Sequence, residues 1–231
     1  NSTFHLGVGT GENMNEGPLG YNFPKYDERA SRMKEALSII RRLLNGEKLD
    51  FEGEFYNTKG AKLYSPPLKD VPIWLAAGGP KSSHLAAEYA DGLMISVKDP
   101  EDAYERVINP AKIKTDELGK SDLRIHTYRW TMFADNDEDA WESLKSWRGL
   151  RAPNRLQEID PQALREQADA LPKEEIMSKF SRAGSVEELI DIYAPLVDDF
   201  GSEIVTIQIS SVNQEETIKL LGKELLPRLK N

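Results

Sequence analysis

The chain has 231 residues, 39% hydrophobic and 30% charged, with a formal net charge of −9 at pH 7 and no cysteine. This composition is typical of a globular domain, and the acidic balance argues against a nucleic acid or a membrane surface as partner. No apolar run approaches the roughly 20 residues that span a bilayer, no signal peptide is visible, and the lack of cysteine excludes disulfides and favours a cytoplasmic protein.

The first predicted element is a short buried strand at residues 4–9, which leads into the glycine-rich segment 7–16. A glycine turn directly after a strand lets backbone N–H groups approach a ligand, and Glu12 adds a carboxylate at that place. A loop to about residue 23 and an amphipathic helix at 26–45 follow. The apolar stripe of that helix is Met33, Ala36, Leu37, Ile40, Leu43 and Leu44.

The middle of the chain alternates strands and helices. Two short strands, at 49–56 and 61–64, flank a predicted turn at 57–60. A second glycine turn, Gly78-Gly79-Pro80, follows the strand at 72–77, and Ser82 or Ser83 can cap the next helix. The remaining predicted elements are a strand at 93–97, a helix at 100–118, a strand at 123–134, a helix at 135–147, helices at 173–181 and 185–199, a strand at 202–210 and a helix at 214–229.

This alternation predicts a parallel sheet covered by helices. No linker divides the chain, so we expect a single domain, residues 1–231, with insertions at about 47–70 and at 148–172, the latter with one short helix. A closed barrel needs eight strand–helix units and about 250 residues. Five principal strands are predicted here, which leaves either an open doubly wound sheet or the C-terminal part of a barrel.

Five sequence blocks occur in a characteristic order. They are the segment 7–16, the pair FEGEFY (51–56) and KGAKLY (59–64), PIWLAAGGP (72–80), ADG (90–92) and ADALP (168–172). Together they resemble the luciferase-like flavin/deazaflavin family, and most closely its coenzyme F420-dependent branch. The last block is similar to that of F420-dependent glucose-6-phosphate dehydrogenases and F420-dependent secondary-alcohol dehydrogenases.

The resemblance implies an α/β fold, a (β/α)8 TIM barrel of which this chain covers about the C-terminal five strand–helix units. The first three units of the family barrel, with an Asp-His pair and a strained non-proline peptide, have no counterpart here. We therefore expect a truncated or incompletely represented enzyme. If the 231 residues were the whole polypeptide, we would expect poor folding, because the open sheet edges would be unpaired.

The resemblance assigns the acid/base role near the deazaflavin to Glu12, whose pKa should then be shifted by burial or by neighbours. The alternative for Glu12 is a helix-capping or loop-solvating role. Gly9, Thr10, Gly11 and Asn15 would line the cofactor, or else serve turn chemistry alone.

Ala77, Gly78 and Gly79 form the second turn, where N–H groups and the following helix N-terminus could hold the cofactor's phosphate. The alternative is a tight turn between a strand and a helix.

Lys98, Arg155 and Lys179 could clamp a substrate phosphate, although each could equally be a surface cation. In the sugar-phosphate enzymes these positions match a lysine, a lysine and an arginine. The last two are exchanged in type here, and that exchange is not neutral, because arginine is a bidentate fork and lysine a point charge.

Other conspicuous residues are expected to be structural. His84 and His126 match no catalytic position, and Trp74 and Trp130 are expected in the core. The acidic run at 135–139 is read as a helix start. No metal-ligand spacing is present, so no metal is expected.

The leading hypothesis is an F420-dependent oxidoreductase that takes hydride from the carbinol carbon of a sugar 6-phosphate. An F420-dependent secondary-alcohol dehydrogenase is the first alternative. A methylene-tetrahydromethanopterin reductase, a monooxygenase using FMN as cofactor and a non-catalytic, cofactor-binding remnant are the others. The resemblance further implies a homodimer.

Overall fold

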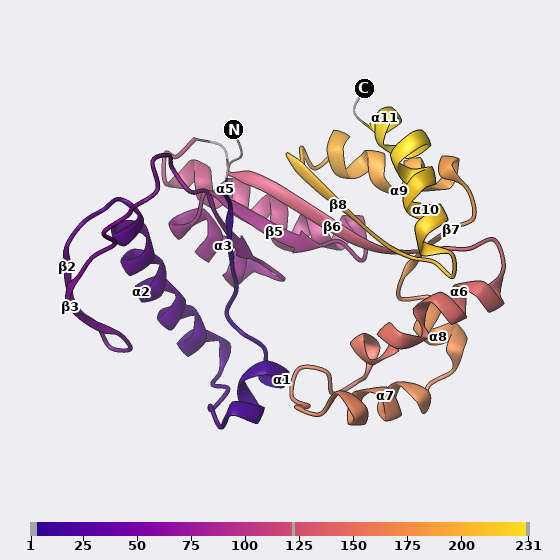
Figure 1. The fold of residues 1–231 in the computed structure, drawn as a ribbon, viewed down its shortest axis with the longest axis horizontal. Helices are drawn as coiled ribbons and strands as arrows, with labels where there is room; N and C mark the ends of the chain where they lie inside the picture. Colours follow the sequence, from indigo (N-terminus) through magenta and orange to yellow (C-terminus); the bar gives the residue numbers. More distant parts are fainter. Residues whose placement is uncertain (1–3, 122, 230–231) are drawn as a thin grey trace. The chain divides into compact units, whose positions relative to one another are not determined.

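The computed structural model describes residues 4–121 and 123–229, which form two compact units (Figure 1). Of these residues, the first unit comprises 4–11, 23–95, 104–121 and 123–125, and the second comprises 12–22, 96–103 and 126–229. No helix in the described ranges is both long enough and apolar enough to cross a membrane. The predicted single-domain organisation stays a prediction.

The first unit is built on a parallel three-stranded sheet. Strand β4 lies between β1 and β5, with Gly7 opposite Trp74 in one pair and Trp74 opposite Gly92 in the other. The elements of this unit are β1 (Leu6–Val8), α2 (Tyr26–Leu44), β2 (Leu49–Glu52), β3 (Asn57–Ala61), β4 (Ile73–Ala76), α3 (Pro80–Tyr89), β5 (Gly92–Ser96), the π-helical turn η2 (Tyr104–Ile108) and α5 (Asn109–Glu117).

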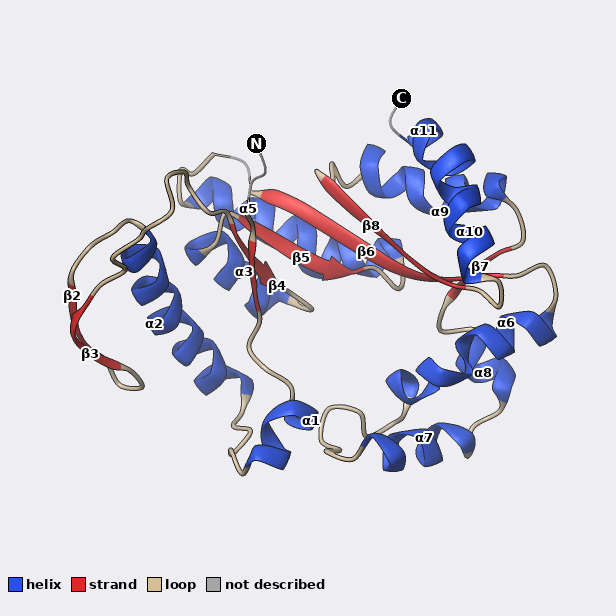
Figure 2. Cartoon of the chain, in the orientation of Figure 1, coloured by secondary structure: helices blue, strands red, loops and turns tan. Residues whose placement is uncertain are grey.

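Strand β4 is the centre of this sheet because its side chains are apolar on both faces. Ile73, Trp74 and Leu75 are each at most 2% exposed, and helices α3 and α5 pack against one another beside the strands (Figure 2). Trp74 is therefore a core residue, as predicted. Of the apolar stripe on α2, Leu37 is fully buried and the other members are only partly buried.

The block at residues 90–92 has a structural explanation. The Asp91 carboxylate accepts hydrogen bonds from the backbone N–H of Ile73 and from Arg41, both at 2.7 Å, and so joins α2 to the start of β4. A Cβ at Gly92 would lie 2.6 Å from the Trp74 ring and 2.9 Å from the Arg124 carbonyl oxygen. Only glycine leaves room for this packing.

The predicted turn at 57–60 is wrong, because those residues form strand β3, which pairs antiparallel with β2. The turn lies at residues 53–56. There the Glu35 carboxylate of α2 accepts hydrogen bonds from the backbone N–H groups of Glu54, Phe55 and Tyr56 at 2.8, 3.0 and 3.1 Å. A carboxylate 19 to 21 residues away therefore fixes the turn, and no local pattern could have shown it.

The second unit is arranged around strand β6, which begins in the first unit. β6 pairs in parallel with β7 at residues 131–133 and with β8 at residues 126–132. Helices α9 and α11 lie side by side near the C-terminus (Figure 1). The elements are α1 (Asn13–Glu16), η1 (Gly17–Leu19), α4 (Pro100–Ala103), β6 (Arg124–Phe133), α6 (Asp137–Leu144), the 3-10 helix η3 (Lys145–Arg151), α7 (Pro161–Asp169), α8 (Lys173–Met177), β7 (Ser181–Ala183), α9 (Val186–Asp198), β8 (Ile204–Ser210), α10 (Gln214–Leu220), the π-helical turn η4 (Leu221–Leu225) and α11 (Leu226–Leu229).

Strand β7 was not predicted, since the sequence pattern placed a helix over 173–181. Its three residues, Ser-Arg-Ala, carry neither alternation nor β-branched side chains, so nothing local marks them as a strand. Pairing with β6 imposes the extended conformation. The predicted loop after the first glycine turn also contains the short helices α1 and η1.

The core of the second unit lies where α6, α7 and α8 meet β6. Its buried members are Met132, Ala140, Leu144, Ala168, Ile176 and Phe180, and Trp130 packs against them. The Trp130 ring also contacts that of Trp147 edge to face, with centroids 4.6 Å apart. Asn136 caps α6 by accepting a hydrogen bond from the Asp139 N–H at 2.9 Å, which confirms the acidic run as a helix start.

Tyr193 gives a pH-dependent test of this unit. Its hydroxyl is fully buried, donates to the Arg129 carbonyl oxygen at 2.9 Å and lies 2.9 Å from the Thr131 hydroxyl. Burial raises the pKa of Tyr193 to about 12. The pKa of tyrosine in an unfolded chain is about 10, so the folded state loses stability as the pH rises between these two pKa values.

We predict that the stability difference between the parent protein and Tyr193→Phe shrinks by about 1.3 kcal/mol between pH 9 and pH 11, since only the parent carries this loss. Urea unfolding at the two pH values measures the difference. A constant difference would contradict the assignment.

Candidate functional site

Glu12 stands at the N-terminal end of α1, directly after Gly11, whose φ of 85° lies in the region that favours glycine. Its side chain does not cap the helix. Instead, Glu12 Oε1 lies 2.9 Å from Nη2 of Arg155, and the two side chains are 50% and 33% exposed. The structure therefore joins two predicted site residues that are 143 positions apart, and it excludes the helix-capping alternative for Glu12.

Helix α1 is tied to the same segment by a second contact. The Asn13 side-chain amide donates to the Gln157 carbonyl oxygen at 2.7 Å. A Cβ at Gly17 would lie 2.6 Å from the Ile159 side chain, so the chain is close-packed here. Asn15 is exposed on α1, and its cofactor contact stays a prediction.

The glycine turn of the first unit is held by Arg29, a residue that sequence reasoning missed. Arg29 donates from Nη1 to the carbonyl oxygens of Thr10 and Gly11 at 3.2 and 3.4 Å, and to the Thr10 hydroxyl at 3.4 Å. Its Nε donates to the Pro24 carbonyl oxygen at 3.1 Å, and its guanidinium lies 4.1 Å from the centre of the Phe23 ring. The guanidinium of Arg29, on α2, therefore fixes the conformation of the turn through several hydrogen bonds.

The second glycine turn is organised by Ser82. Its hydroxyl oxygen accepts from the N–H groups of Gly78 and Gly79 at 3.0 and 3.2 Å and donates to the Gly79 carbonyl oxygen at 2.9 Å. Ser82 lies in the first turn of α3, whose N-cap is Gly79, so neither Ser82 nor Ser83 is the N-cap. An anion that used these two N–H groups would have to displace the serine hydroxyl.

The other predicted residues of these turns differ in accessibility. Ala77 is buried, and its N–H donates to the Met94 carbonyl oxygen at 2.9 Å, so that donor is already used. Gly9 and Gly78 are exposed, and a Cβ built at Gly78 or at Gly79 meets no atom within 4 Å. The backbone at this second turn is therefore open to a ligand.

Two of the three predicted clamp cations, Lys98 and Arg155, share an environment in the second unit. Burial and the nearby guanidinium groups of Arg151 and Arg155 lower the pKa of Lys98, whereas Asp102 opposes the shift. The ammonium of Lys179 is engaged elsewhere, 2.9 Å from Glu175 Oε1 one helical turn away. The backbone carbonyl of Lys179 instead accepts from Arg151 at 3.1 Å.

Tyr128 and Arg151 belong to this environment and were not predicted. Burial raises the pKa of Tyr128, Arg155 opposes that shift, and the charge of Glu12 adds to it. Burial and Arg155 lower the pKa of Arg151. Sequence signals for both were weak, since Tyr128 sits within a strand and Arg151 is one of 30 lysines and arginines.

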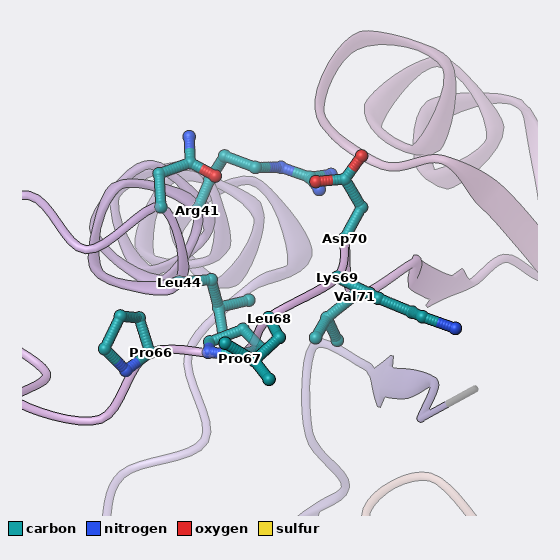
Figure 3. A pocket seen from close by; sticks show the side chains of 9 residues that line it. Arg41, Leu44, Pro66, Pro67, Leu68, Lys69, Asp70 and Val71 are labelled. Atoms are coloured by element: carbon teal, nitrogen blue, oxygen red, sulfur yellow. The ribbon is translucent and has the colours of Figure 1, made fainter. Parts of the chain in front are cut away.

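A hollow of about 300 Å³ in the first unit is lined by none of the predicted site residues (Figure 3). Arg41 and Leu44 reach it from α2, and the proline-rich segment 66–71 forms its other wall. Among the described residues, no group of three or more histidine and acidic side chains could hold a metal ion.

The comparison with protein-family models decides the family, because the luciferase-like monooxygenase model matches residues 4–202. The chain belongs to the luciferase-like monooxygenase family. The predicted family and its α/β barrel class are thereby confirmed, whereas the number of barrel units that this family member covers stays a prediction.

Curated relatives of this family member include F420-dependent glucose-6-phosphate dehydrogenases. That of Microbacterium testaceum (strain StLB037) is 33% identical over 97% of this chain and 68% of its own length. That of Mycolicibacterium gilvum (strain PYR-GCK) is 32% identical over 97% of this chain and 69% of its own length.

Solved structures agree with this family. An F420-dependent secondary alcohol dehydrogenase in complex with an F420-acetone adduct has a TM-score of 0.88 at 25% identity, over 98% of this chain and 70% of that one. A coenzyme F420 dependent tetrahydromethanopterin reductase from Methanopyrus kandleri has a TM-score of 0.77 at 20% identity, over 97% and 74% of the two chains. The second likeness concerns the fold alone.

We predict that Arg29→Lys loosens the first glycine turn, because lysine keeps the charge but cannot reproduce the fork. The free energy of unfolding should fall by about 1–2 kcal/mol, and the amides of Thr10 and Gly11 should exchange faster. Arg32→Lys is the matched control: Arg32 lies on the same helix and forms an exposed pair with Glu28 at 2.7 Å, so the loss should stay below about 0.5 kcal/mol. Equal effects of the two substitutions would contradict the role of Arg29.

Proposed function

We propose that the protein is a coenzyme F420-dependent oxidoreductase that transfers hydride from the carbinol carbon of a sugar 6-phosphate to F420. The ion pair of Glu12 with Arg155 carries this proposal, because it sets a carboxylate suited to proton transfer beside a cation suited to a phosphate. Family membership, the F420-dependent dehydrogenases among the relatives and the fold of the F420-acetone complex support the choice of cofactor.

The turns of the first unit fit the demands of a deazaflavin that carries a phosphate. Open space beside the backbone of Gly78 and Gly79 allows close approach, and displacement of the Ser82 hydroxyl would release two N–H donors. Gly9, Thr10 and Gly11 would contact its polar edge, in a conformation that Arg29 holds. Asn15 keeps its predicted cofactor contact as part of the proposal, and Ala77 would contact the cofactor through a group other than its N–H, which Met94 already engages.

The bound deazaflavin would supply a ring carbon that accepts the hydride. Glu12 would handle the accompanying proton at the cofactor ring, and its Oε1, which Arg155 binds in the absence of substrate, would be released when Arg155 binds the substrate phosphate. Lys98 and Arg155 would bind the substrate phosphate. Tyr128, whose pKa is raised by burial, stays a neutral phenol beside these charges.

An F420-dependent secondary-alcohol dehydrogenase is the second candidate. The observation that favours it is the contact of Lys179 with Glu175, which engages one of the three cations predicted for a phosphate clamp. The solved alcohol dehydrogenase is similar to this chain at a TM-score of 0.88. A cytoplasmic location and a homodimer also belong to the proposal, and rest on the cysteine-free sequence and on the family resemblance.

Cofactor and substrate can be tested together. We expect F420 fluorescence to be quenched on titration with the protein, and glucose 6-phosphate to reduce bound F420 faster than propan-2-ol does. Quenching with FMN but not with F420 would overturn the choice of cofactor. A higher kcat/KM for propan-2-ol would replace the first candidate with the second.

We predict that Glu12→Gln lowers kcat by about 10²- to 10⁴-fold, because the amide cannot transfer a proton, and leaves F420 quenching nearly unchanged. Glu16→Gln, on the same helix α1, is the matched control and should retain kcat. Steady-state kinetics at saturating F420 measures both variants. A Glu12→Gln enzyme with a kcat within about threefold of the parent would remove Glu12 from the chemistry.

A further inference from the structure

Three cations of the second unit, Lys98, Arg151 and Arg155, influence one another electrostatically, and the sequence analysis had grouped only Lys98 and Arg155. They come from the segment after β5, from the end of η3 and from the turn that follows it. Each of the two arginines depresses the pKa of Lys98, and Arg155 depresses that of Arg151, so the three act on one another electrostatically. Arg155 enters the turn through a hydrogen bond from its N–H to the Ala152 carbonyl oxygen at 3.3 Å.

The position of Arg151 is fixed by several neighbours. Its Nη2 donates to the Lys179 carbonyl oxygen at 3.1 Å, and its guanidinium lies 4.2 Å from the centre of the Phe180 ring. Its Nε is buried and has no hydrogen-bond partner within the part of the chain that the structure describes. A buried guanidinium donor without a partner is costly, and an anion would satisfy it.

Helix η3, which ends at Arg151, is held in place by contacts with α7. Arg148 binds the Asp169 carboxylate through two hydrogen bonds, of 2.5 and 2.8 Å. A Cβ at Gly149 would lie 3.4 Å from the Leu164 side chain, which places η3 in van der Waals contact with α7. Asp169, of the sequence block ADALP, therefore has a structural role that supports Arg151.

The charge of these three cations is not balanced by their acidic neighbours. Among the described residues, the carboxylates that act on these three cations are Glu12, which pairs with Arg155, and Asp102, which acts on Lys98. Like charges that are partly buried repel one another unless a ligand compensates them. A phosphate monoester, with close to two negative charges near neutral pH, would supply that compensation.

We propose that Arg151 completes, with Lys98 and Arg155, a binding site for a dianionic phosphate monoester, and that Lys179 supports this site through its carbonyl oxygen rather than its ammonium. The inference rests on the proposed function, since the monoester would be the phosphate of the sugar substrate. It assigns substrate specificity to a residue that the sequence blocks do not contain. The anion takes Arg155 from Glu12, so the bound phosphate frees both oxygens of that carboxylate.

Inorganic phosphate is the probe that tests the site without the cofactor. Titration calorimetry of the protein should show that Arg151→Gln weakens phosphate binding by about tenfold or more, and that Arg151→Lys weakens it less. Lys179→Gln should change the affinity by less than about threefold. Lys219→Gln is its matched control, because Lys219 pairs with Glu215 at the same four-residue spacing. Glu12→Gln should bind phosphate more tightly, because the internal competitor is lost.

The inference is overturned if Lys179→Gln weakens phosphate binding as much as Arg151→Gln, or if both Arg151 variants bind as the parent does. If Arg151→Gln fails to fold, Arg151→Lys decides, since parent-like affinity then contradicts the proposal. With glucose 6-phosphate, Arg151→Lys should raise KM and leave kcat and the KM for propan-2-ol unchanged. F420 quenching, measured separately, shows whether the proposed function fails for another reason.

Discussion

The ion pair between Glu12 and Arg155 is the contact on which the rest of the site depends. It joins the N-terminal end of α1 to the turn after η3, and the hydrogen bond from Asn13 to the Gln157 carbonyl oxygen supports the same junction. Both partners are partly exposed, and pairs of this kind contribute at most about 1 kcal/mol. Such a pair is strong enough to position two side chains and weak enough to be exchanged for a ligand. The Glu12 carboxylate therefore pairs with Arg155 until an anionic ligand displaces it.

The acidic residues near Arg151 stabilise the segments around it and do not pair with Arg151 itself. The carboxylate of Asp169 binds Arg148, and that of Glu175 binds Lys179. The Arg148–Asp169 pair fixes η3, which ends at Arg151. The Lys179–Glu175 pair fixes the segment whose carbonyl oxygen, at Lys179, accepts a hydrogen bond from Arg151. The first unit follows the same logic at its glycine turns. Arg29 and Ser82 hold backbone groups in place, and the space beside Gly78 and Gly79 stays open.

The sequence was most informative where local pattern and tertiary structure agree. The apolar run of β4, the helix α2, the capped start of α6 and the family blocks could be read directly, and Glu12 stood out because a carboxylate follows a glycine turn. What could not be read depended on distant partners. The turn at 53–56 exists because Glu35 binds its N–H groups, and β7 is extended because β6 pairs with it. No sequence pattern around Arg151 marked it as a binding residue. Lys179 was predicted to bind phosphate because its position matches that of a cation in the family, but only the structure shows that its ammonium pairs with Glu175.

The most direct measurement is a crystal structure of the protein with bound inorganic phosphate. The phosphate is expected on the guanidinium groups of Arg151 and Arg155 and on the ammonium of Lys98, with the Glu12 carboxylate released from Arg155. A phosphate bound to the ammonium of Lys179, or a Glu12–Arg155 pair that stays intact beside a phosphate bound elsewhere, would contradict the proposed anion site.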